Sequence, residues 1–304
     1  MHMPGAAPSR GVAYAEGRYM PLEEATIAML DRGFVRSDAT YDVVHVWKGR
    51  FFRLEDHLDR FERSVAGLRM TLPLPREEIA AILHGCVRRA GLADAYVQMA
   101  LTRGVPPPGT RDPKLCQNRF TAFAQPFVWI ANEAQRREGL SLVVTKTQRI
   151  PPEAVDPRIK NFHWLDLTMG IFEAQDRGAD VPLLPDRDGN LTEGPGFNVF
   201  ALHGRTLVTP DRGMFEGMTR RSVIELAPEL QLAVEERALH ASELARAEEI
   251  FLTSTAGGIM PVSRLDGAPV GEGRPGPVTR AMHDLYWRRH EEGWLATPVD
   301  YEGG

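Results

Sequence analysis

The sequence predicts an α+β protein built from two domains. In the first half, helical patterns alternate with strand patterns, and the strands are joined by tight turns typical of antiparallel pairing. A polar segment around residue 135 lacks a sustained apolar face, and a new strand pattern begins after it. The chain has 304 residues, 43% hydrophobic and 25% charged, which suits two modest domains. We therefore expect a small N-terminal α/β domain at 1–135 and a larger C-terminal domain at 136–304.

The first half opens with a predicted β-hairpin. Residues 40–47, TYDVVHVW, precede the turn 48–50 and then Phe51-Phe52, a pattern rich in β-branched and aromatic residues. Apolar residues at 54, 58, 61, 65 and 68 then give the spacing of an amphipathic helix, with Arg60 beside the apolar stripe. The other expected elements are a helix at 76–90 and strands at 95–102 and 120–130, with Pro126 a candidate break.

The second half is expected to mix short strands with helices. The polar segment 132–139 has helix-like composition and is followed by a strand at 140–145. Further expected elements are a helix at 165–177, strands at 181–185 and 197–202, a hairpin through 203–205 into 206–209, helices at 219–227 and 241–247, and a strand at 249–253 that ends in the loop 254–258.

Composition excludes several classes of function. The formal charge of −5 comes from interspersed signs without a basic stripe, so nucleic acid is not an expected partner. The N-terminal segment has no apolar run after a basic start, and no stretch approaches about 18 uninterrupted apolar residues, so we expect no membrane partner and a cytoplasmic protein. Cys86, Cys116 and the nine histidines fit neither a disulfide framework nor a metal-ligand spacing, and we predict no metal.

Lys160 is the most informative single residue. The chain has thirty-two arginines and only four lysines, and Lys160 lies in the apolar setting IKNFHW. A lysine held in a partly desolvated pocket loses its proton more readily and becomes a nucleophile that forms a Schiff base with an aldehyde or carbonyl group. Lys48, Lys114 and Lys146 lie in a turn, a Pro-rich loop and a predicted strand end, which are ordinary settings.

Glu193 is a candidate partner for a ring nitrogen. It lies in LTEGPGFNVF, where Gly, Pro and Gly follow the carboxylate before a strand-like run begins. This pattern is typical of a group presented at a tight strand entry, where it can pair with a protonated nitrogen. By itself, the segment is better explained as a plain turn carrying a surface glutamate.

Two segments are candidate anion cradles. In EGMTRRS, Gly217 precedes Thr219 at a helix start, where backbone N–H groups and a hydroxyl can converge on an anion. The loop TSTAGG at 253–258 offers hydroxyls and amides at a strand end, and Arg60 can add a counter-charge. The plain alternatives are an ordinary helix cap and a solvated surface arginine. Together with a nucleophilic lysine and a carboxylate, however, these are the parts that pyridoxal 5'-phosphate requires.

The order of these motifs resembles that of the fold-type IV pyridoxal-phosphate aminotransferases. TYDV, HLDR, LTRG, IKN, LTEGPGFNVF, GMTR and TSTAGG succeed one another, and the resemblance covers residues 25–290. Within this family, VDPRIKNFHWLDLTMGIFEAQDRGA and EEIFLTSTAGGIMPVSRLDG most resemble the (R)-selective amine transaminases. The resemblance implies the D-amino-acid aminotransferase-like fold, with a small N-terminal α/β domain and a larger β-barrel-like C-terminal domain with helices.

The resemblance also implies a function. We expect transfer of an amino group from a primary (R)-amine to a keto acid such as pyruvate, through a Schiff base on Lys160. The alternatives are a D-amino-acid or branched-chain L-amino-acid transaminase and, less expected, a lyase of the aminodeoxychorismate type or a non-catalytic binding protein. Because a second subunit completes the active site in this family, we also expect a homodimer.

Individual residues receive roles by the same resemblance. Lys160 moves the proton between substrate and cofactor, and Glu193 keeps the pyridine nitrogen protonated. The residues expected to hold the phosphate or pack on the ring are Arg60, Phe215, Met218, Thr219 and Thr255. The residues expected to line the substrate pockets are Tyr41, Val43, Tyr96, Gln98, Trp164 and Ala256.

Two departures from the family pattern concern the substrate carboxylate. The loop after LTRG normally supplies a carboxylate-binding arginine, and here that position is Pro108, with Arg111 nearby. The residue before Ser37-Asp38 is usually histidine in the amine transaminases, and here it is Arg36. Arg36 or Arg111 is therefore a candidate bidentate cation for an α-carboxylate. The plainer interpretation of Arg36 is an arginine on the rim of the site.

Overall fold

The computed structural model describes residues 11–302, and these residues form two compact units that are not continuous in sequence. Unit 1 contains residues 11–128, 159–162 and 293–302, and unit 2 contains 129–158 and 163–292. The segment that carries Lys160 thus belongs to unit 1. The domains expected at 1–135 and 136–304 stay a prediction, because compactness in the folded chain is a different property from independent folding.

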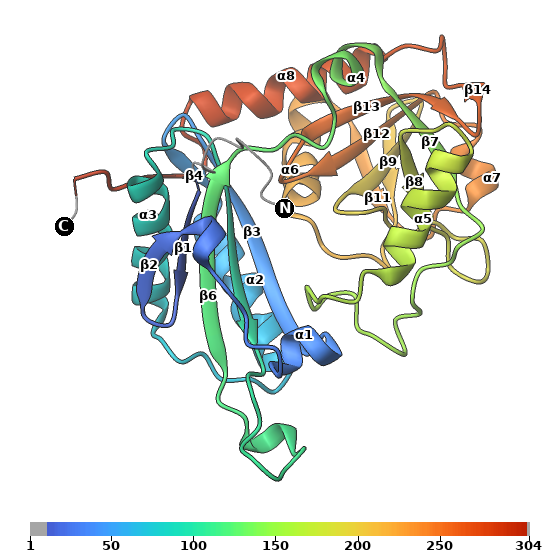
Figure 1. Ribbon diagram of the computed structural model, residues 1–304. Helices are drawn as coiled ribbons and strands as arrows, with labels where there is room; N and C mark the ends of the chain where they lie inside the picture. The colour runs from blue at the N-terminus through green and yellow to red at the C-terminus, as the bar shows by residue number, and fades with distance from the viewer. Residues whose placement is uncertain (1–10, 303–304) are drawn as a thin grey trace, which may run out of the picture. The chain divides into compact units, whose positions relative to one another are not determined.

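Unit 1 is built on a seven-stranded antiparallel sheet in the order β15-β4-β3-β5-β6-β1-β2. Figure 1 labels β1, β2, β3, β4 and β6 of this sheet. Its strands are β1 (Val12–Ala15), β2 (Arg18–Pro21), β3 (Ala39–Trp47), β4 (Arg50–Phe52), β5 (Ala95–Thr102), β6 (Arg119–Pro126) and β15 (Ala296–Pro298). Its helices are α1 (Arg32–Arg36), α2 (Leu54–Gly67) and α3 (Arg76–Ala90), with single 3₁₀ turns at Leu22–Glu24 and Pro113–Leu115.

Helices α2 and α3 cover the same face of this sheet. The predicted apolar stripe of α2, including Leu58 and Phe61, is buried with α3 against alternate residues of β3 such as Val44 and Val46. Because side chains alternate along a strand, Asp42 shares this helix-covered face, whereas Tyr41 points to the other one. The two faces of β3 therefore carry different chemistry.

Unit 2 is built on an eight-stranded sheet whose seven-strand path runs β11-β10-β9-β12-β13-β7-β8, with β14 paired to β13. Its strands are β7 (Leu140–Val144), β8 (Val181–Leu183), β9 (Asn198–His203), β10 (Thr206–Thr209), β11 (Ala233–Glu236), β12 (Glu249–Ser254), β13 (Gly258–Leu265) and β14 (Ala268–Pro269). Its helices are α4 (Glu133–Glu138), α5 (Leu165–Asp176), α6 (Met218–Leu226), α7 (Ala241–Leu244) and α8 (Pro277–Glu291), with a 3₁₀ turn at Ala227–Leu230.

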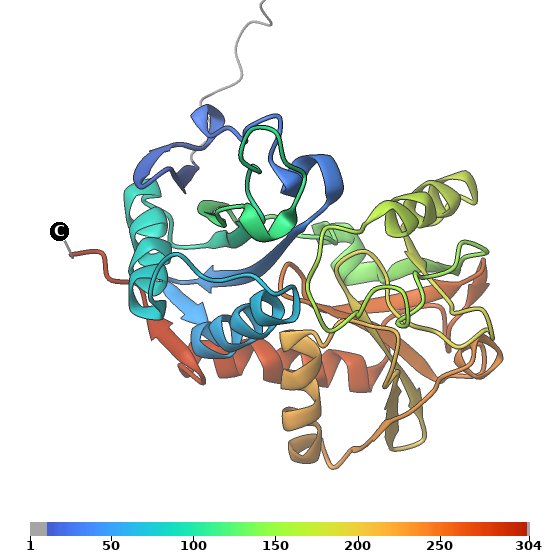
Figure 2. The ribbon, with the colours of Figure 1, turned by 90° about the horizontal axis from the view of Figure 1, so that it is seen from below.

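Helices α6 and α8 pack on each other and on β12, as Figure 2 shows in unit 2. The carboxylate of Glu249, at the start of β12, accepts hydrogen bonds from the first N–H groups of α8 at Val278 (3.0 Å) and Thr279 (2.7 Å). A buried acceptor at a helix N-terminus satisfies donors that the helix cannot satisfy itself. This cap fixes α8 against the strand that leads into the loop 254–258.

Both units combine a sheet with helices, so the α+β prediction is confirmed. The strand predicted at 120–130 is wrong beyond Pro126, where β6 ends and the ladder to β5 stops. The sequence patterns also missed the β1–β2 hairpin, α1 and α8.

Within the residues that the structure describes, no helix is long and apolar enough to cross a membrane. The same residues contain no group of three or more histidine, cysteine, aspartate or glutamate side chains arranged to hold a metal ion.

Candidate functional site

The backbone of Lys160 is attached to β3 and α2 within unit 1. Its carbonyl oxygen accepts hydrogen bonds from the N–H of Tyr41 (3.2 Å) and from Thr40 Oγ1 (2.7 Å). Its own N–H donates to Ser64 Oγ at 3.3 Å. These contacts to a strand and a helix that share one core hold the segment 159–162 in place, although its chain neighbours belong to unit 2.

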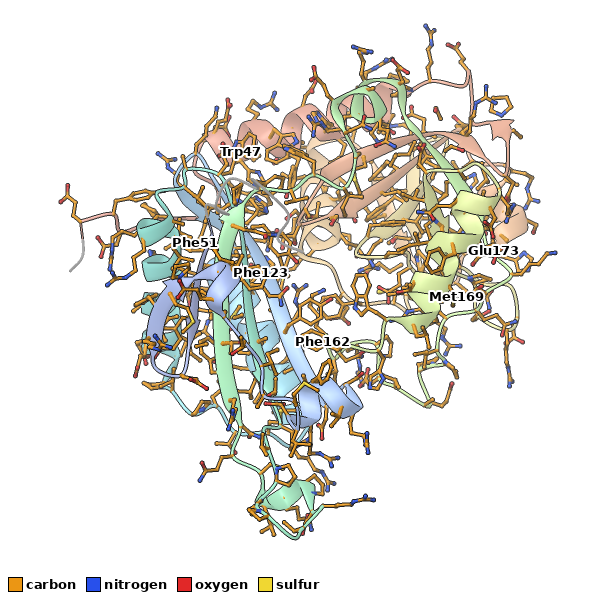
Figure 3. All side chains as sticks on the ribbon, viewed as in Figure 1. Trp47, Phe51, Phe123, Phe162, Met169 and Glu173 are labelled. Carbon is orange, nitrogen blue, oxygen red and sulfur yellow. The ribbon has the colours of Figure 1, made fainter. Side chains whose placement is uncertain are left out.

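The side chain of Lys160 lies beside aromatic rings. Its Nζ is 4.6 Å from the ring centroid of Tyr41, which suits a cation–π contact. The ring of Phe162, labelled in Figure 3, lies 4.7 Å from that of Tyr41, centroid to centroid, so an aromatic side chain of the Lys160 segment contacts one of β3. Lys160 is half-buried, as the apolar sequence around it suggested.

Arg60 lies in a buried ion cluster on the helix-covered face of the sheet. Its Nε donates to Asp42 Oδ2 and its Nη2 to Asp42 Oδ1, both at 2.8 Å. His57 Nδ1 is also 2.8 Å from Asp42 Oδ1. The exposed fractions of the three side chains are only 0% for Asp42, 1% for His57 and 4% for Arg60, so this is a charged group inside a protein core.

Protonation in this cluster follows from burial and from the partners. Burial alone would raise the pKa of Asp42, but the Arg60 guanidinium and the His57 hydrogen bond overcome that effect and hold the pKa well below its usual range. Burial lowers the pKa of His57, and the nearby Arg60 and Lys160 charges act in the same direction against the opposing effect of Asp42. The cluster thus pairs an ionised Asp42 with Arg60 beside a neutral His57.

Four of the predicted pocket residues share the other face of the same sheet. Val43 pairs with Gln98 across β3 and β5, and Tyr96 lies two residues from Gln98 on that face. Tyr96 stacks on Phe123 of β6 at 6.2 Å between centroids and donates a long hydrogen bond of 3.4 Å to Gln98 Oε1. With Tyr41 these residues make the helix-free face predominantly aromatic and apolar.

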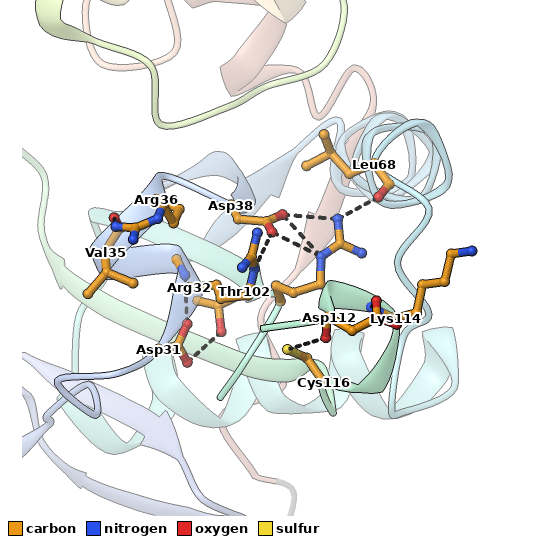
Figure 4. Close-up of polar contacts among 12 residues, drawn as sticks. Asp31, Arg32, Val35, Arg36, Asp38, Leu68, Thr102, Asp112, Lys114 and Cys116 are labelled. Carbon is orange, nitrogen blue, oxygen red and sulfur yellow. Dashed lines mark hydrogen bonds and ion pairs between the residues drawn. The ribbon is translucent and has the colours of Figure 1, made fainter. Parts of the chain in front are cut away.

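Arg36 and Arg111, the candidate carboxylate-binding residues, are both exposed. Arg36 ends α1 and its Nη1 donates to the carbonyl oxygen of Val35 at 2.6 Å (Figure 4). The short helix is anchored by Asp31, which accepts from Gly33 N–H and from Thr102 Oγ1, each at 2.8 Å. Arg36 is therefore an exposed side chain on an anchored backbone.

A second anchor lies just after α1. The carboxylate of Asp38 accepts from Arg32 Nε at 2.9 Å and from Arg103 Nη2 at 2.9 Å (Figure 4). Burial would raise the pKa of Asp38, but hydrogen bonds from both arginines lower it overall. Arg103 also donates to the carbonyl oxygen of Leu68 at 2.7 Å, which ties the start of β3 to the end of α2.

In unit 2, Glu193 has a partner on each carboxylate oxygen. Its Oε1 accepts from Arg149 Nε at 3.0 Å and its Oε2 from the N–H of Phe215 at 2.9 Å. Arg149 Nη1 in turn donates to Asp166 Oδ2 at 2.6 Å. Burial would lower the pKa of Arg149, but the two carboxylates raise it overall, so the arginine stays charged.

Unit 2 also contains the two predicted anion cradles. Helix α6 begins with Met218 and Thr219, and its cap residue Gly217 is extended and supplies no side-chain acceptor. A Cβ at Gly217 would lie 2.2 Å from Asn198 Oδ1, so only glycine fits there. The buried hydroxyl of Thr253, the first residue of the second predicted cradle, has no hydrogen-bond partner among the described residues. An unsatisfied buried hydroxyl is uncommon and indicates a site for an acceptor.

Hydrogen bonds connect these unit 2 residues into one site. Asn198 Nδ2 donates to the carbonyl oxygen of Phe215 at 2.8 Å, which joins the strand after Glu193 to the segment before Thr219. Ser254 Oγ donates to the carbonyl oxygen of Gly196 at 2.7 Å, which joins the same strand entry to the turn containing Thr255 and Ala256. Trp164, the residue before α5, approaches Gly196 closely, with its Cη2 3.8 Å from where a Cβ would be.

The sequence patterns did not single out Asp42, His57, Arg149 or Asp166. One available indication was Asp42 itself, an acidic residue in the middle of the otherwise apolar strand TYDVVHVW. A carboxylate at such a position is stable only with a buried partner. The partners of Glu193 gave no comparable indication, because Arg149 is 44 residues away in sequence.

The sequence is similar to one family of known proteins and to several of its members. A profile of the family described as Amino-transferase class IV matches residues 39–265. The chain is 29% identical over 276 residues to a putative branched-chain-amino-acid aminotransferase of Methanocaldococcus jannaschii, covering 90% of this chain and 94% of that protein. It is also 29% identical over 266 residues to a D-alanine aminotransferase of Bacillus licheniformis, covering 87% of this chain and 92% of that protein.

Solved structures agree with the sequence comparisons. The branched-chain aminotransferase of the archaeon Thermoproteus uzoniensis, crystallised with norvaline, superposes with a TM-score of 0.86. That structure is 28% identical and covers 95% of this chain and 99% of its own. The branched-chain amino acid aminotransferase of Thermobaculum terrenum, in its PLP-form, also gives a TM-score of 0.86 at 28% identity, covering 97% of this chain and 100% of its own.

Proposed function

The chain belongs to the class IV aminotransferases, and on that premise we propose that it moves an amino group from a primary (R)-amine to a keto acid such as pyruvate. The observation that carries the amine side of this proposal is the aromatic setting of Lys160. Its Nζ lies over the Tyr41 ring, and the ring of Phe162 contacts the Tyr41 ring at a tilt of 44°. Such a surface suits the apolar body of a primary amine better than a second charged group.

The cofactor of this enzyme family is pyridoxal 5'-phosphate, and the residues present fit it. The acidic Glu193 suits a protonated ring nitrogen, while the uncapped start of α6 and the unpartnered Thr253 hydroxyl suit a phosphate. When bound, the cofactor supplies an aldehyde that combines with primary amines and a ring that withdraws electrons. Arg60, Met218, Thr219 and Thr255 would hold the phosphate, and Phe215 would pack on the ring.

Lys160 is the residue we assign to covalent attachment and proton transfer. Its backbone is held by Tyr41, Thr40 and Ser64, so the movement of its side chain pivots on a fixed Cα. When Nζ is neutral and not covalently attached, a positioned amine of this kind would take up a proton, hold it and give it back at Nζ. The aromatic surface of Tyr41 excludes water from one side of Nζ.

Glu193 is the residue we assign to the ring nitrogen. Together with Asp166 and Arg149 it forms a cluster that has two carboxylates and one guanidinium, so one negative charge is in excess. An excess negative charge in a buried site stabilises a proton on a neighbouring base. The backbone N–H of Phe215 fixes the direction of the carboxylate.

A second candidate function is transamination of D-amino or branched-chain L-amino acids. It is supported by the names of relatives, which include D-alanine and branched-chain-amino-acid aminotransferases. Such substrates bring a carboxylate to the site in both half-reactions. Arg36 and Arg111 are the arginines that we propose for it, since a guanidinium can bind a carboxylate with two parallel hydrogen bonds.

We also propose a homodimer, in which a second copy completes the substrate site. Support comes from apolar side chains exposed on each unit. Unit 1 exposes a cluster around α1, and unit 2 exposes one stripe of α5 at helical spacing; the residues are Ile27, Met29, Leu30, Phe34, Leu165, Met169 and Phe172. Large apolar side chains exposed close together in sequence, or at helical spacing on one helix, are what a protein contact would cover. A cytoplasmic location remains a prediction from sequence.

The substrate class is tested by a half-reaction. Purified protein loaded with the cofactor is mixed separately with (R)-1-phenylethylamine, its (S)-enantiomer, D-alanine and L-leucine, and the loss of cofactor absorbance is followed. We expect fast bleaching with the (R)-amine and none with the (S)-amine. Bleaching with D-alanine or L-leucine alone would contradict the amine proposal and support the second candidate.

The carboxylate role is tested separately by Arg36→Ala, Arg111→Ala and the double variant. Loss of a bidentate contact should raise the Michaelis constants for pyruvate and D-alanine about tenfold. The Michaelis constant for (R)-1-phenylethylamine, which has no carboxylate, serves as the internal control. Unchanged values for pyruvate and D-alanine in the double variant would remove both arginines from the proposed site.

A further inference from the structure

We propose that Asp42 and His57 are positioning residues for the cofactor phosphate, and that both act through Arg60. This inference rests on the proposed function, because it requires the chain to bind pyridoxal 5'-phosphate. It goes beyond that function by assigning a role to two residues of unit 1 whose side chains meet the arginine rather than the cofactor. The argument depends on how the three side chains share their hydrogen bonds.

The carboxylate of Asp42 determines the plane of the Arg60 guanidinium. Both of its oxygens accept from one edge of that group, Nε and Nη2, at 2.8 Å each. A guanidinium is planar and carries its five donors in a fixed arrangement. Bonding along one edge therefore fixes the plane of the guanidinium, and with it the plane in which the Nη1 donors lie.

His57 determines the orientation of the carboxylate in turn. Asp42 is ionised and can only accept, so the proton at the 2.8 Å contact must lie on His57 Nδ1. Arg60 Nη2 lies 3.2 Å from the same nitrogen, but both atoms are donors and both converge on Asp42 Oδ1. His57 is therefore the Nδ1–H tautomer. Its donor holds the carboxylate against rotation, and through it the arginine.

The charges of Asp42, Arg60 and His57 explain why the direction of the Arg60 donors matters. Asp42 and Arg60 cancel, and His57 is neutral because burial lowers its pKa. Arg60 therefore brings little net positive charge toward a phosphate, and its contribution depends on how well its donors are aimed. A change that misdirects Arg60 should weaken binding of a phosphate-bearing ligand while sparing the rest of the cofactor.

The test compares His57→Asn with His57→Gln. The side-chain amide nitrogen of asparagine can occupy the place of Nδ1, whereas that of glutamine lies nearer the place of Nε2, so only asparagine keeps the donor to Asp42. Dissociation constants of pyridoxal 5'-phosphate and of pyridoxal, which lacks the phosphate, are measured by absorbance titration of the apoprotein. We expect glutamine to weaken pyridoxal 5'-phosphate about tenfold, with asparagine and every pyridoxal value within about twofold of wild type.

Equal weakening of both ligands, or equal behaviour of the two variants, would overturn the proposal. If wild-type protein bound pyridoxal 5'-phosphate no better than pyridoxal, the proposed function would fail as well, which separates the two failures. If a variant does not fold, the proposal can still be tested by a measurement on the wild-type protein. The ¹⁵N shifts of the His57 ring should show a neutral Nδ1–H tautomer, and a neutral Nε2–H tautomer would contradict the inference.

Discussion

The two units each bury a cluster of ionised side chains, but the clusters differ in their balance of charge. In unit 1, Asp42 and Arg60 cancel beside the neutral His57. In unit 2, Arg149 faces two carboxylates, Glu193 and Asp166, so one negative charge remains. The balanced cluster is also the more deeply buried, with side chains at most 4% exposed against 8–10% in unit 2.

This difference suggests different roles: the unit 1 cluster orients the Arg60 guanidinium, and the unit 2 cluster supplies negative charge to a bound ligand. A fully buried pair without a net charge costs least to keep inside a protein, and its value lies in fixed geometry. An unbalanced cluster is less stable by itself, and the imbalance becomes useful when a ligand brings the opposite charge. We therefore expect that neutralising one carboxylate costs mainly stability in the unit 1 cluster and mainly activity in the unit 2 cluster.

The largest effect on stability should come from Asp42→Asn. This change removes the carboxylate that balances the buried charge of Arg60, so the free energy of unfolding should fall by about 3 kcal/mol. Urea denaturation of the apoprotein measures it. Arg221→Ala is a matched control, because Arg221 pairs with Glu225 on the exposed surface of α6 and its loss should change stability by less than about 1 kcal/mol. A similarly small change for Asp42→Asn would contradict the balanced-pair account.

Glu193→Gln should affect catalysis more than stability. Arg149 stays paired with Asp166, but glutamine offers a single acceptor to the two donors that Glu193 accepts from, Arg149 Nε and the N–H of Phe215. The free energy of unfolding should therefore fall by about 1–2 kcal/mol, less than for Asp42→Asn. The rate of the half-reaction should nevertheless fall about a hundredfold, since the excess charge that favours a protonated ring nitrogen is lost. A large loss of stability together with unchanged turnover would reverse the roles that we assign to the two clusters.

The smallest effect concerns pH. The pKa of His57 is lowered in the folded chain, chiefly by burial, so the unfolded chain binds the extra proton first. Above the pKa of about 6.5 that a histidine has in the unfolded chain, His57 is neutral in both states and does not lower the free energy of unfolding. As the pH falls below that value toward the folded pKa, the unfolded chain takes up the proton first, and the free energy of unfolding decreases. His57→Asn should therefore reduce the loss of unfolding free energy between pH 7 and pH 5 by about 1 kcal/mol. Parallel curves for the two proteins would show that His57 does not titrate in this window. His84, whose pKa burial also lowers, is present in both proteins and cancels in the comparison.

The sequence predicted those strands and helices whose own residue composition and spacing are typical of the element that they form. The hairpin of β3 and β4 and helix α2 were expected close to their observed bounds, because the β-branched and aromatic content of the hairpin and the 3.6-residue stripe of the helix are strong signals. Helix α8 was missed because its buried side includes Thr279 and His290, which read as polar. The β1–β2 hairpin was missed because its turn is Glu16-Gly17. Glu16 adopts a positive φ there, and Glu-Gly is not one of the residue pairs, such as Asn-Gly or Asp-Gly, by which a two-residue hairpin turn is usually predicted.

The candidate site, too, could be predicted from the sequence only where local motifs specify it. Motifs identified Lys160 and Glu193, and the comparisons confirm the fold-type IV fold that those motifs implied. No sequence pattern connected Arg60 with Asp42, since they meet only when α2 packs on β3. Burial of a charge is a tertiary property, and it is what separates the two clusters.

The central claim is that Lys160, held by unit 1, provides the amine to which the cofactor is attached. The most direct measurement is to treat the loaded protein with borohydride, digest it, and locate the attached pyridoxyl group by mass spectrometry. The account predicts attachment at Lys160 alone and none in a Lys160→Ala protein, while Lys146→Ala behaves as wild type. Attachment at Lys48, Lys114 or Lys146, or no attachment in the wild-type protein, would contradict it.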